Sequence, residues 1–307
     1  MSKKNRIGRT RVDRIFDFLN VVFMALIILI MAYPLYFTII ASISDPNEVV
    51  LGNVLLVPHG FTLEAYENVF KNDSIWLGYL NSLRNTFFGT LLALFFTIPP
   101  AYALSKQELP GRTVINWIFL FTMYFGGGLI PYYLIVRSLN LLDKPYTVIV
   151  LCGGCGVMNM IITRTYYRTS IPQSLYEAAY IDGSSELNTF VKIALPLSMP
   201  IIAVIALYCA IGFWNEYMTT LIYTSSREYQ TLQMVLRQIL ILNQKLISQI
   251  DFSSDDGSAV ETARRMAYMA QVMKYSVIII ASLPMLIIYP FIQKYFVKGV
   301  MIGSLKG

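Results

Sequence analysis

The residue types that most often carry chemistry are few in this chain. Its one histidine, His59, has no second ligand at metal-binding spacing, and its three cysteines cannot form a disulfide framework. Cys152 and Cys155 form a C-x-x-C pair, a spacing that elsewhere can hold a metal or a redox disulfide. Here glycines surround the pair inside an apolar run, which favours close helix packing instead. No G-x-x-x-x-G-K-[ST] phosphate loop is present, so we expect no catalytic site, no metal site and no ATPase activity in this chain.

A polar and aromatic string, Trp214-Asn215-Glu216-Tyr217, interrupts another apolar run. An ionisable side chain in such a run is costly in a membrane and therefore suggests a function. Aromatic faces can pack on a ligand ring, and amide or carboxylate groups bind hydroxyls, so the string is a candidate for a substrate pathway. The alternative assigns the rings to an interfacial aromatic belt and the carboxylate to hydrogen bonding between helices. Further candidates for the pathway are Tyr124, Tyr132 and Asn159.

The segment from Thr163 to Ala194 has the signals of two short helices joined by a turn. Ser170-Ile171-Pro172-Gln173 fits a capping box with proline in the first turn, which predicts a helix that continues through Tyr180. Gly183 suits the left-handed residue that ends this helix, and Ser184 or Ser185 can cap a second helix from about Glu186 to Ile193.

Long apolar runs must position these residues. Hydrophobic residues make up 56% of the 307 positions and charged residues 14%, a balance typical of a membrane protein. Six runs approach or exceed the roughly 17 to 25 residues that a helix needs to cross a bilayer. They are Phe16 to Ile43, Leu83 to Leu104, Val114 to Val136, Thr147 to Ile162, Pro200 to Tyr223 and Val272 to Phe296. The first is too long for a cleavable signal peptide, so we expect it to be retained as a spanning helix.

The basic residues predict the orientation. Six lysines and arginines precede the first run, against Asp13 alone, so the N-terminus should stay in the cytoplasm, and six spans then place the C-terminus there too. The predicted parts are a cytoplasmic tail (1–15), a six-helix transmembrane domain (16–296) and a second cytoplasmic tail (297–307). Loops at about 44–82 and 224–271 should be external, and the loop at about 163–195 cytoplasmic. The net charge of +6 needs no nucleic-acid partner, since basic tails are attracted to anionic lipid.

Two external segments carry helix signals of their own. One should hold a short helix from Thr62 to Phe70, and the other an amphipathic helix from Leu232 to Ile247, where apolar residues recur at helical spacing. Asp251 to Ser258 is typical of a solvated loop.

The hairpin also carries a recognisable motif. Glu177-Ala178-Ala179, three residues, Gly183, nine residues, Ile193, one residue and Leu195-Pro196 resemble the EAA loop of binding-protein-dependent ABC permeases. The resemblance implies an all-α type I importer permease fold, in which this cytoplasmic hairpin couples the spans to ATPase subunits. The residues that it assigns to coupling are Glu177, Ala178, Ala179, Tyr180, Asp182, Gly183, Ile193, Leu195 and Pro196.

Other strings narrow the resemblance. Asn81 to Thr86, Trp214 to Tyr217 and Gln293 to Gly299 are similar to the carbohydrate-uptake branch of the second-permease, maltose type, and Tyr124 to Pro131 is similar to permeases for complex oligosaccharides. The family implies a bacterial cell-membrane complex with a homologous second permease, two ABC ATPases and an external sugar-binding protein. ATP and Mg²⁺ would bind to the ATPases, and this chain would bind no cofactor. The C-terminal tail of this chain would extend towards the ATPases.

Two rival functions remain open from the sequence. An ABC permease for a non-sugar substrate would share the EAA loop. A secondary transporter would use its intramembrane charges to carry ions and would transport without a partner ATPase.

Overall fold

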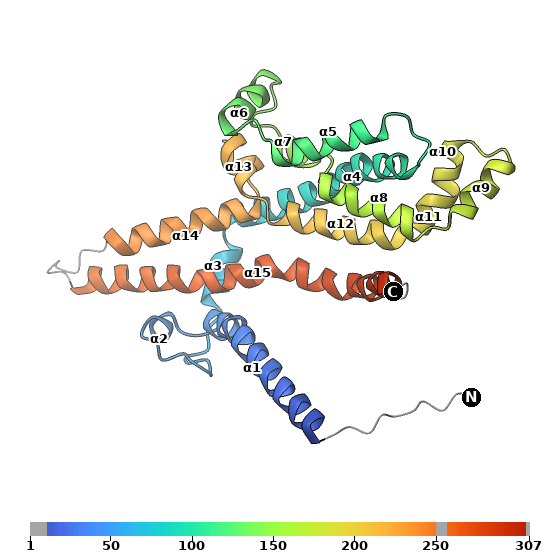
Figure 1. Ribbon diagram of the computed structural model, residues 1–307. Helices are drawn as coiled ribbons and strands as arrows, with labels where there is room; N and C mark the ends of the chain where they lie inside the picture. Colours follow the sequence, from blue (N-terminus) through green and yellow to red (C-terminus); the bar gives the residue numbers. More distant parts are fainter. Residues whose placement is uncertain (1–10, 250–256, 305–307) are drawn as a thin grey trace. The chain divides into compact units, whose positions relative to one another are not determined.

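The computed structural model describes residues 11–249 and 257–304, which form helices joined by short loops (Figure 1). The chain divides into two compact units, Met1–Lys71 with Leu242–Ile280, and Asn72–Ile241 with Ala281–Gly307. The predicted all-α fold is confirmed, because the described residues contain no β-strand.

The first unit is built around α1 (Arg11–Ser42). It also contains α2 (Pro46–Val50), α3 (Glu64–Phe70) and the first half of α15 (Gly257–Ser304). Asp45 caps α2, and the hydroxyl of Thr62 accepts a hydrogen bond from the Glu64 amide, so the predicted helix at Thr62 begins two residues later. A small core joins the four helices: Ile40, Ala41, Val49, Val54, Ala65, Met269 and Val272.

The second unit contains the remaining elements, except that the residues from Leu242 onward in the helix Leu232–Gln249 belong to the first unit. In chain order they are α4 (Asp73–Ser105), α5 (Arg112–Tyr124), α6 (Leu129–Ser138), α7 (Thr147–Cys152), α8 (Val157–Thr169), α9 (Gln173–Ile181), α10 (Glu186–Thr189), the π-helical turn η1 (Phe190–Ala194), α11 (Leu195–Leu197), α12 (Met199–Trp214), α13 (Met218–Tyr223), the 3₁₀ turn η2 (Arg227–Tyr229) and α14 (Leu232–Gln249). α14 confirms the helix predicted from Leu232, and its first residues Leu232, Met234, Val235 and Leu236 are buried.

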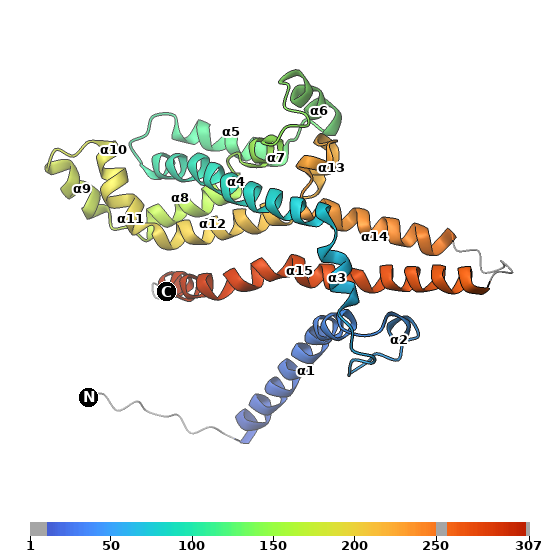
Figure 2. The same ribbon diagram turned by 180° about the vertical axis from the view of Figure 1, so that it is seen from behind.

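The long helix α4 packs against α8 and α12. Gly89 permits the close approach to α12, since a Cβ there would lie 2.3 Å from an atom of the Phe213 ring. Figures 1 and 2 place α9 and α10 at one end of this bundle and α6 and α13 at the other.

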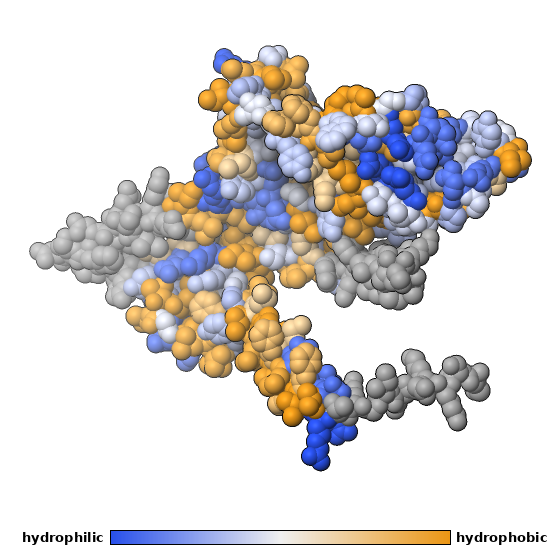
Figure 3. Space-filling view, viewed as in Figure 1, coloured by the Kyte–Doolittle hydropathy of each residue, from blue (hydrophilic) through white to orange (hydrophobic). Residues whose placement is uncertain are grey.

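Three described helices are long and apolar enough to cross a membrane: Arg11–Ser42, Asp73–Ser105 and Ala267–Ile288. The count rises to five if each of two bent helix pairs is one span. The most apolar window of α1 has no residue buried inside the chain, and Figure 3 shows a hydrophobic surface along this helix. Such a helix is suited to lipid or to another apolar protein surface.

Glycines divide two of the predicted spans. At Gly126 to Gly128 the chain turns by 109° between α5 and α6, and Gly128 has a positive φ of 82°. The predicted span from Thr147 to Ile162 is two helices, α7 and α8, separated by the segment Gly153 to Gly156. Neither half is long enough to cross a bilayer alone. Glycine lowers helix stability, which favours a break at both glycine segments, and the positive φ of Gly128 sets the turn that precedes α6.

Several predictions fall on the chain ends and the last loop. Residues 1–10 of the N-terminal tail, 251–256 of the solvated loop and 305–307 of the C-terminal tail lie outside the described residues, whereas Gly257 to Ser304 are helical.

Candidate functional site

The segment 173–197, here called the hairpin, is the helix, turn and helix that the sequence predicts. α9 ends at Ile181, and Gly183 has a φ of +73°, the left-handed conformation predicted for it. The amide of Gly183 donates to the Tyr180 carbonyl at 3.0 Å, and the amide of Ser184 donates to the Ala179 carbonyl at 2.9 Å. These two bonds form a Schellman motif, which satisfies carbonyls at the end of α9 while reversing the chain.

The second helix begins as predicted, but the first does not. Ser185 caps α10, since its hydroxyl accepts from the Asn188 amide at 3.3 Å. The capping box predicted at Ser170 is wrong: that residue has helical backbone angles, its amide bonds to Tyr166 as the end of α8, and Pro172 stands at the start of α9 without a side-chain cap. Pro172 itself has a ψ of 133°, which is not helical, so it is the N-cap residue and the new helix begins at Gln173.

Beyond α10 the second helix of the hairpin continues through η1 into α11. In η1 the Leu195 amide donates to Phe190, five residues earlier. Pro196 has no amide hydrogen to donate, which disturbs the α-helical ladder at this position. Of the motif residues here, Ile193 and Leu195 are half-buried and Pro196 is exposed.

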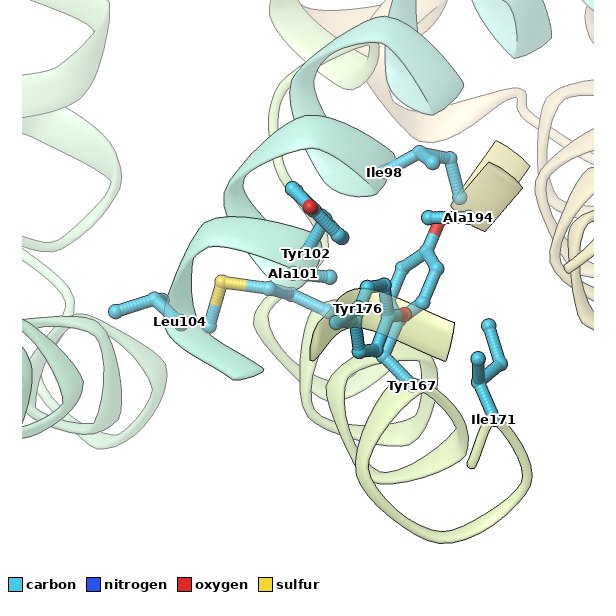
Figure 4. Packing of buried hydrophobic residues seen from close by; sticks show 9 residues of the cluster. Ile98, Ala101, Tyr102, Leu104, Tyr167, Ile171, Tyr176 and Ala194 are labelled. Carbon is cyan, nitrogen blue, oxygen red and sulfur yellow. The ribbon is translucent and has the colours of Figure 1, made fainter. Parts of the chain in front are cut away.

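An aromatic cluster fixes the hairpin to the end of α4 (Figure 4). Tyr102 of α4 contacts Tyr167 of α8 edge to face, with ring centroids 5.5 Å apart. The Tyr102 ring also lies 4.9 Å from the ring of Phe190 in η1. Tyr176 of α9 packs on the same ring at 6.1 Å. The buried residues of this core are Ile98, Ala101, Tyr102, Leu104, Met160, Tyr167, Ile171, Tyr176 and Ala194. Close-packed cores transmit displacement rather than absorb it, so the hairpin and α4 are expected to move together.

Polar contacts strengthen the same joint. The hydroxyl of Tyr102 donates to Glu186 Oε2 at 3.1 Å, and Lys106 Nζ lies 3.8 Å from that oxygen. Lys106 Nζ also lies 3.7 Å from the centroid of the Tyr176 ring, a cation–π contact. Burial raises the pKa of Tyr176 to about 12, with smaller contributions from Tyr167 and Glu186. Tyr176 is therefore neutral at physiological pH.

The outer face of the hairpin is apolar at its tip. Tyr180, Ile181 and Leu187 are 82%, 83% and 73% exposed, respectively. Glu177, Ala178, Asp182 and Gly183 are also exposed, whereas Ala179 is buried, with 5% of its surface exposed. Figure 3 shows that the surrounding surface at this end is largely hydrophilic. Beside α9 lies a pocket of about 590 Å³, lined by Lys106, Glu108, Gln173, Tyr176, Glu177, Tyr180, Ile181 and Glu186. An exposed apolar tip with a polar rim is typical of a protein-binding surface.

The polar string at residue 215 forms a break between α12 and α13. Asn215 ends α12, and its side chain bonds to the Ile211 carbonyl at 2.9 Å. Glu216 Oε1 accepts the Thr219 amide at 2.6 Å and so caps α13. The backbone carbonyl of Glu216 accepts the Thr231 hydroxyl at 3.0 Å.

The candidate pathway residues divide between two environments. Glu216 and Asn159 line one pocket of about 250 Å³, together with Ala93, Cys152, Gly154, Gly156, Cys209, Gly212 and Phe213. The sequence reasoning missed the last seven as pocket residues. The glycines next to Cys152 are the available signal, because bare backbone leaves space, but the same glycines also suit close helix packing, which is the interpretation that the apolar run favours.

The remaining candidates do not line this pocket. Trp214 is 2% exposed, and its indole donates to the Ala281 carbonyl at 3.0 Å, as expected of a buried structural residue. Tyr217 is 39% exposed and lies 5.9 Å from the Arg237 guanidinium. Tyr132 packs edge to face on Tyr223 at 6.0 Å, and Tyr124 at the end of α5 is 76% exposed.

One further polar contact joins two loops at the α6 and α13 end. Asp143, in a left-handed conformation with φ 53°, accepts the amides of Ser225 and Ser226 at 3.0 and 2.8 Å and the Ser226 hydroxyl at 2.6 Å. Its own amide donates to the Tyr223 carbonyl at 2.9 Å. The hydrogen bonds from Ser226 are the main cause of a lowered pKa of the Asp143 carboxyl.

Comparisons with known proteins agree with the EAA motif. Residues 73–302 match the family described as binding-protein-dependent transport system inner membrane component. The chain is 39% identical, over 96% of its length and 99% of the relative's, to the polygalacturonan/rhamnogalacturonan transport system permease protein YtcP of Bacillus subtilis (strain 168). It is 38% identical over the whole of both chains to protein LplC of the same organism.

A solved structure gives the same assignment. The chain resembles a subunit in the crystal structure of a bacterial ABC transporter involved in the import of the acidic polysaccharide alginate. The TM-score is 0.82 at 33% sequence identity, and the match covers 94% of this chain and 99% of the other. The chain belongs to the family of inner-membrane permease components of binding-protein-dependent ABC transport systems, and it is a transport subunit rather than an enzyme.

Proposed function

We propose that this chain is one permease subunit of a carbohydrate importer and that the carbohydrate is an oligosaccharide. We also propose that its hairpin receives mechanical work from ATPase subunits. The observation that carries the proposal is the construction of the hairpin: an exposed apolar tip at Tyr180, Ile181 and Leu187 on a helix that a buried aromatic cluster fixes to α4. The names of YtcP and of the alginate transporter support the carbohydrate substrate.

The complete transporter would contain a homologous second permease, two ATPases that bind ATP and Mg²⁺, and an external sugar-binding protein. The tip would dock on an ATPase. Closure of the ATPases would then move the hairpin, and the rigid cluster around Tyr102 would pass the movement to α4 and the other spans. Alternating access follows, because two arrangements of packed helices expose the pathway to opposite sides.

This mechanism requires a defined orientation. The hairpin and both chain ends would lie in the cytoplasm, with 1–15 and 297–307 as tails and 16–296 as the transmembrane domain. The loops at 44–82 and 224–271 would face outward. The basic N-terminal residues support this orientation.

The test is reconstitution of the assembled transporter in liposomes. We expect sugar uptake only with ATP, the ATPases and the loaded binding protein. Uptake by this chain alone, driven by an ion gradient, would replace the proposal with a secondary transporter. Calorimetry of the cognate binding protein with oligosaccharides, peptides and ions tests the substrate class separately, and selective binding of a peptide or an ion would contradict the carbohydrate assignment.

A further inference from the structure

The pocket beside Glu216 has a composition that lipid would not tolerate. Its wall combines a carboxylate, the Asn159 amide, two thiols and the bare backbones of Gly154, Gly156 and Gly212. All three glycines are exposed, and Glu216 and Asn159 are half-buried. A carboxylate and uncovered backbone groups are strongly disfavoured where they face hydrocarbon. This face therefore meets water or protein, as the wall of a transport pathway does.

The hydrogen-bonding groups of the pocket match hydroxyls. Among the described residues, Glu216 Oε1 holds the Thr219 amide, whereas Oε2 has no hydrogen-bond partner. Within the part of the chain that the structure describes, the Asn159 amide donates to the Cys209 sulfur at 3.7 Å, and a thiol is a weak acceptor that a stronger one can replace. A hydroxyl can donate to Oε2 and accept from the Asn159 amide, so one sugar unit can use both groups. Phe213 and Ala93 supply an apolar wall for a sugar ring.

The charge of the pocket disfavours negatively charged ligand groups. None of its nine lining residues is a lysine, an arginine or a histidine. Glu216 therefore presents negative charge to the pocket without a cation in its wall, and a second carboxylate placed there would be repelled.

We infer that this pocket is a subsite for the hydroxyl face of a single sugar unit and that Glu216 excludes anionic substituents from it. The inference rests on the proposed function and adds a specificity-determining residue to it. A uronate-containing oligosaccharide could still pass, provided that its carboxylates point away from this pocket.

Two pocket cysteines supply a probe that does not depend on transport. In the assembled transporter, Cys152 and Cys209 would be labelled with a cationic or an anionic methanethiosulfonate reagent, with rates normalised to those of free cysteine. Cys155 packs instead against the aromatic cluster around Tyr102 and is the internal control. We expect the cationic reagent to be favoured at least about tenfold at Cys152 and Cys209. In Glu216→Gln, which retains an acceptor for the Thr219 amide, this preference should fall to near one.

Removal of a negative charge outside the pocket should leave the preference for the cationic reagent unchanged. Glu228 is exposed and does not line the pocket, so Glu228→Gln is the matched control. Access is tested by Gly212→Leu, because a Cβ at Gly212 meets nothing within 4 Å and a side chain there starts in open space at the pocket wall. This variant should slow labelling of Cys152 and Cys209, whereas Gly127→Leu, equally unobstructed and outside the pocket, should not.

Protection by sugars identifies the ligand class. α-1,4-Galactobiose and α-1,4-digalacturonate differ in the group at carbon 6, hydroxymethyl or carboxylate. We expect galactobiose to slow labelling of Cys152 and Cys209 and digalacturonate to do so at least about tenfold less effectively at equal concentration. Equal protection by the two sugars, no protection by either, or reagent preferences that Glu216→Gln leaves unchanged would overturn the inference. Those outcomes would leave ATP-driven sugar uptake intact, whereas failure of the proposed function would abolish uptake.

Discussion

Gly183 is the residue that allows the hairpin to reverse. Its φ of +73° is costly for a residue with a Cβ, by about 1–2 kcal/mol, and more for a β-branched side chain. We predict that Gly183→Val distorts the turn and the position of the tip. Sugar imported per ATP hydrolysed should fall at least about tenfold in proteoliposomes, with the complex still assembled.

Gly111 offers a matched control for this substitution. It also has a φ of +73°, and a Cβ at either glycine meets nothing within 4 Å. Gly111→Val carries the same backbone strain but lies outside the hairpin, so its coupling ratio should stay near that of the unmodified transporter. Equal coupling in the two variants would remove Gly183 from the mechanism.

Asp143 gives a prediction about pH. Because the hydrogen bonds from Ser226 and Ser225 lower its pKa in the folded chain, the stability that they add is complete above the ordinary aspartate pKa of about 4. That stability is lost as the pH falls through the lowered value. Hydrogen exchange of the Ser225 and Ser226 amides, corrected for intrinsic rates, should show protection that disappears in this acidic range.

The control for the pH prediction is Asp143→Asn. An asparagine oxygen can still accept the two amides that Oδ1 holds, but its nitrogen cannot accept the Ser226 hydroxyl. We expect about 1–2 kcal/mol less protection at neutral pH and no pH dependence. Protection that falls with pH in the asparagine variant would assign the effect to another group.

Single residues also show where sequence reasoning succeeds. Gly183 and Ser185 were predictable because a helix end and a helix start have strong local preferences. Ser170 was not, because its serine-proline context suited a cap while the preceding helix α8 continued to that residue. Capping preferences alone cannot decide whether such a residue ends one helix or begins the next.

At the scale of elements, the contact between α4 and the hairpin is the joint through which movement would pass. Tyr102→Phe keeps the ring packing and removes the hydrogen bond to Glu186. We expect less transport per ATP and a loss of about 0.5–1.5 kcal/mol in stability, typical of one hydrogen bond. Uptake and hydrolysis measured together in proteoliposomes give the coupling ratio.

A double variant separates this bond from the nearby ion pair. Glu186 is 75% exposed, so its ion pair with Lys106 at 3.8 Å should contribute little. Tyr102→Phe combined with Glu186→Gln should therefore be only slightly worse than Tyr102→Phe alone. Additive losses in coupling would mean that the two residues act independently.

The tip of α9 gives a prediction about assembly. Ile181 is 83% exposed, and an aspartate there would place a charge in an apolar contact. We predict that Ile181→Asp weakens co-purification of the ATPases by at least about tenfold in affinity, while the chain itself still reaches the membrane.

Ser174→Asp adds the same charge to the same helix. Ser174 is exposed and does not line the pocket beside α9, so this variant should keep its ATPases. Loss of the ATPases in both variants would point to a general effect of charge on the hairpin rather than to docking of the tip.

The helices were predictable where a long apolar run or helical spacing of apolar residues marked them, as in α4 and α14. Their interruptions were not. The sequence predicts single spans at 114–136 and 147–162, yet each is divided, because glycines permit a break that hydropathy does not detect. The pocket beside Glu216 arises from one of these breaks, so its lining residues could not be assembled from the sequence alone.

At the scale of the whole molecule, one helix joins the two sites of the second unit. α12 begins directly after the hairpin and ends at Trp214, two residues before Glu216. A rigid helix of 16 residues between the tip that would receive force and the pocket that would hold sugar gives a short mechanical path. The proposed partner proteins, the ATPases and the second permease, come from the resemblance to other permeases, because the residues of a single chain cannot specify them.

The central claim is that the hairpin lies in the cytoplasm against an ATPase. It is tested by Leu187→Cys at the exposed tip, in a transporter in which the three native cysteines of this chain are replaced by serine. A short crosslinker with a maleimide at one end and a photoreactive group at the other should join this cysteine to an ATPase subunit, and a membrane-impermeant maleimide added to intact cells should not modify it. Rapid modification from outside, or no crosslink in a complex that imports sugar, would contradict the claim.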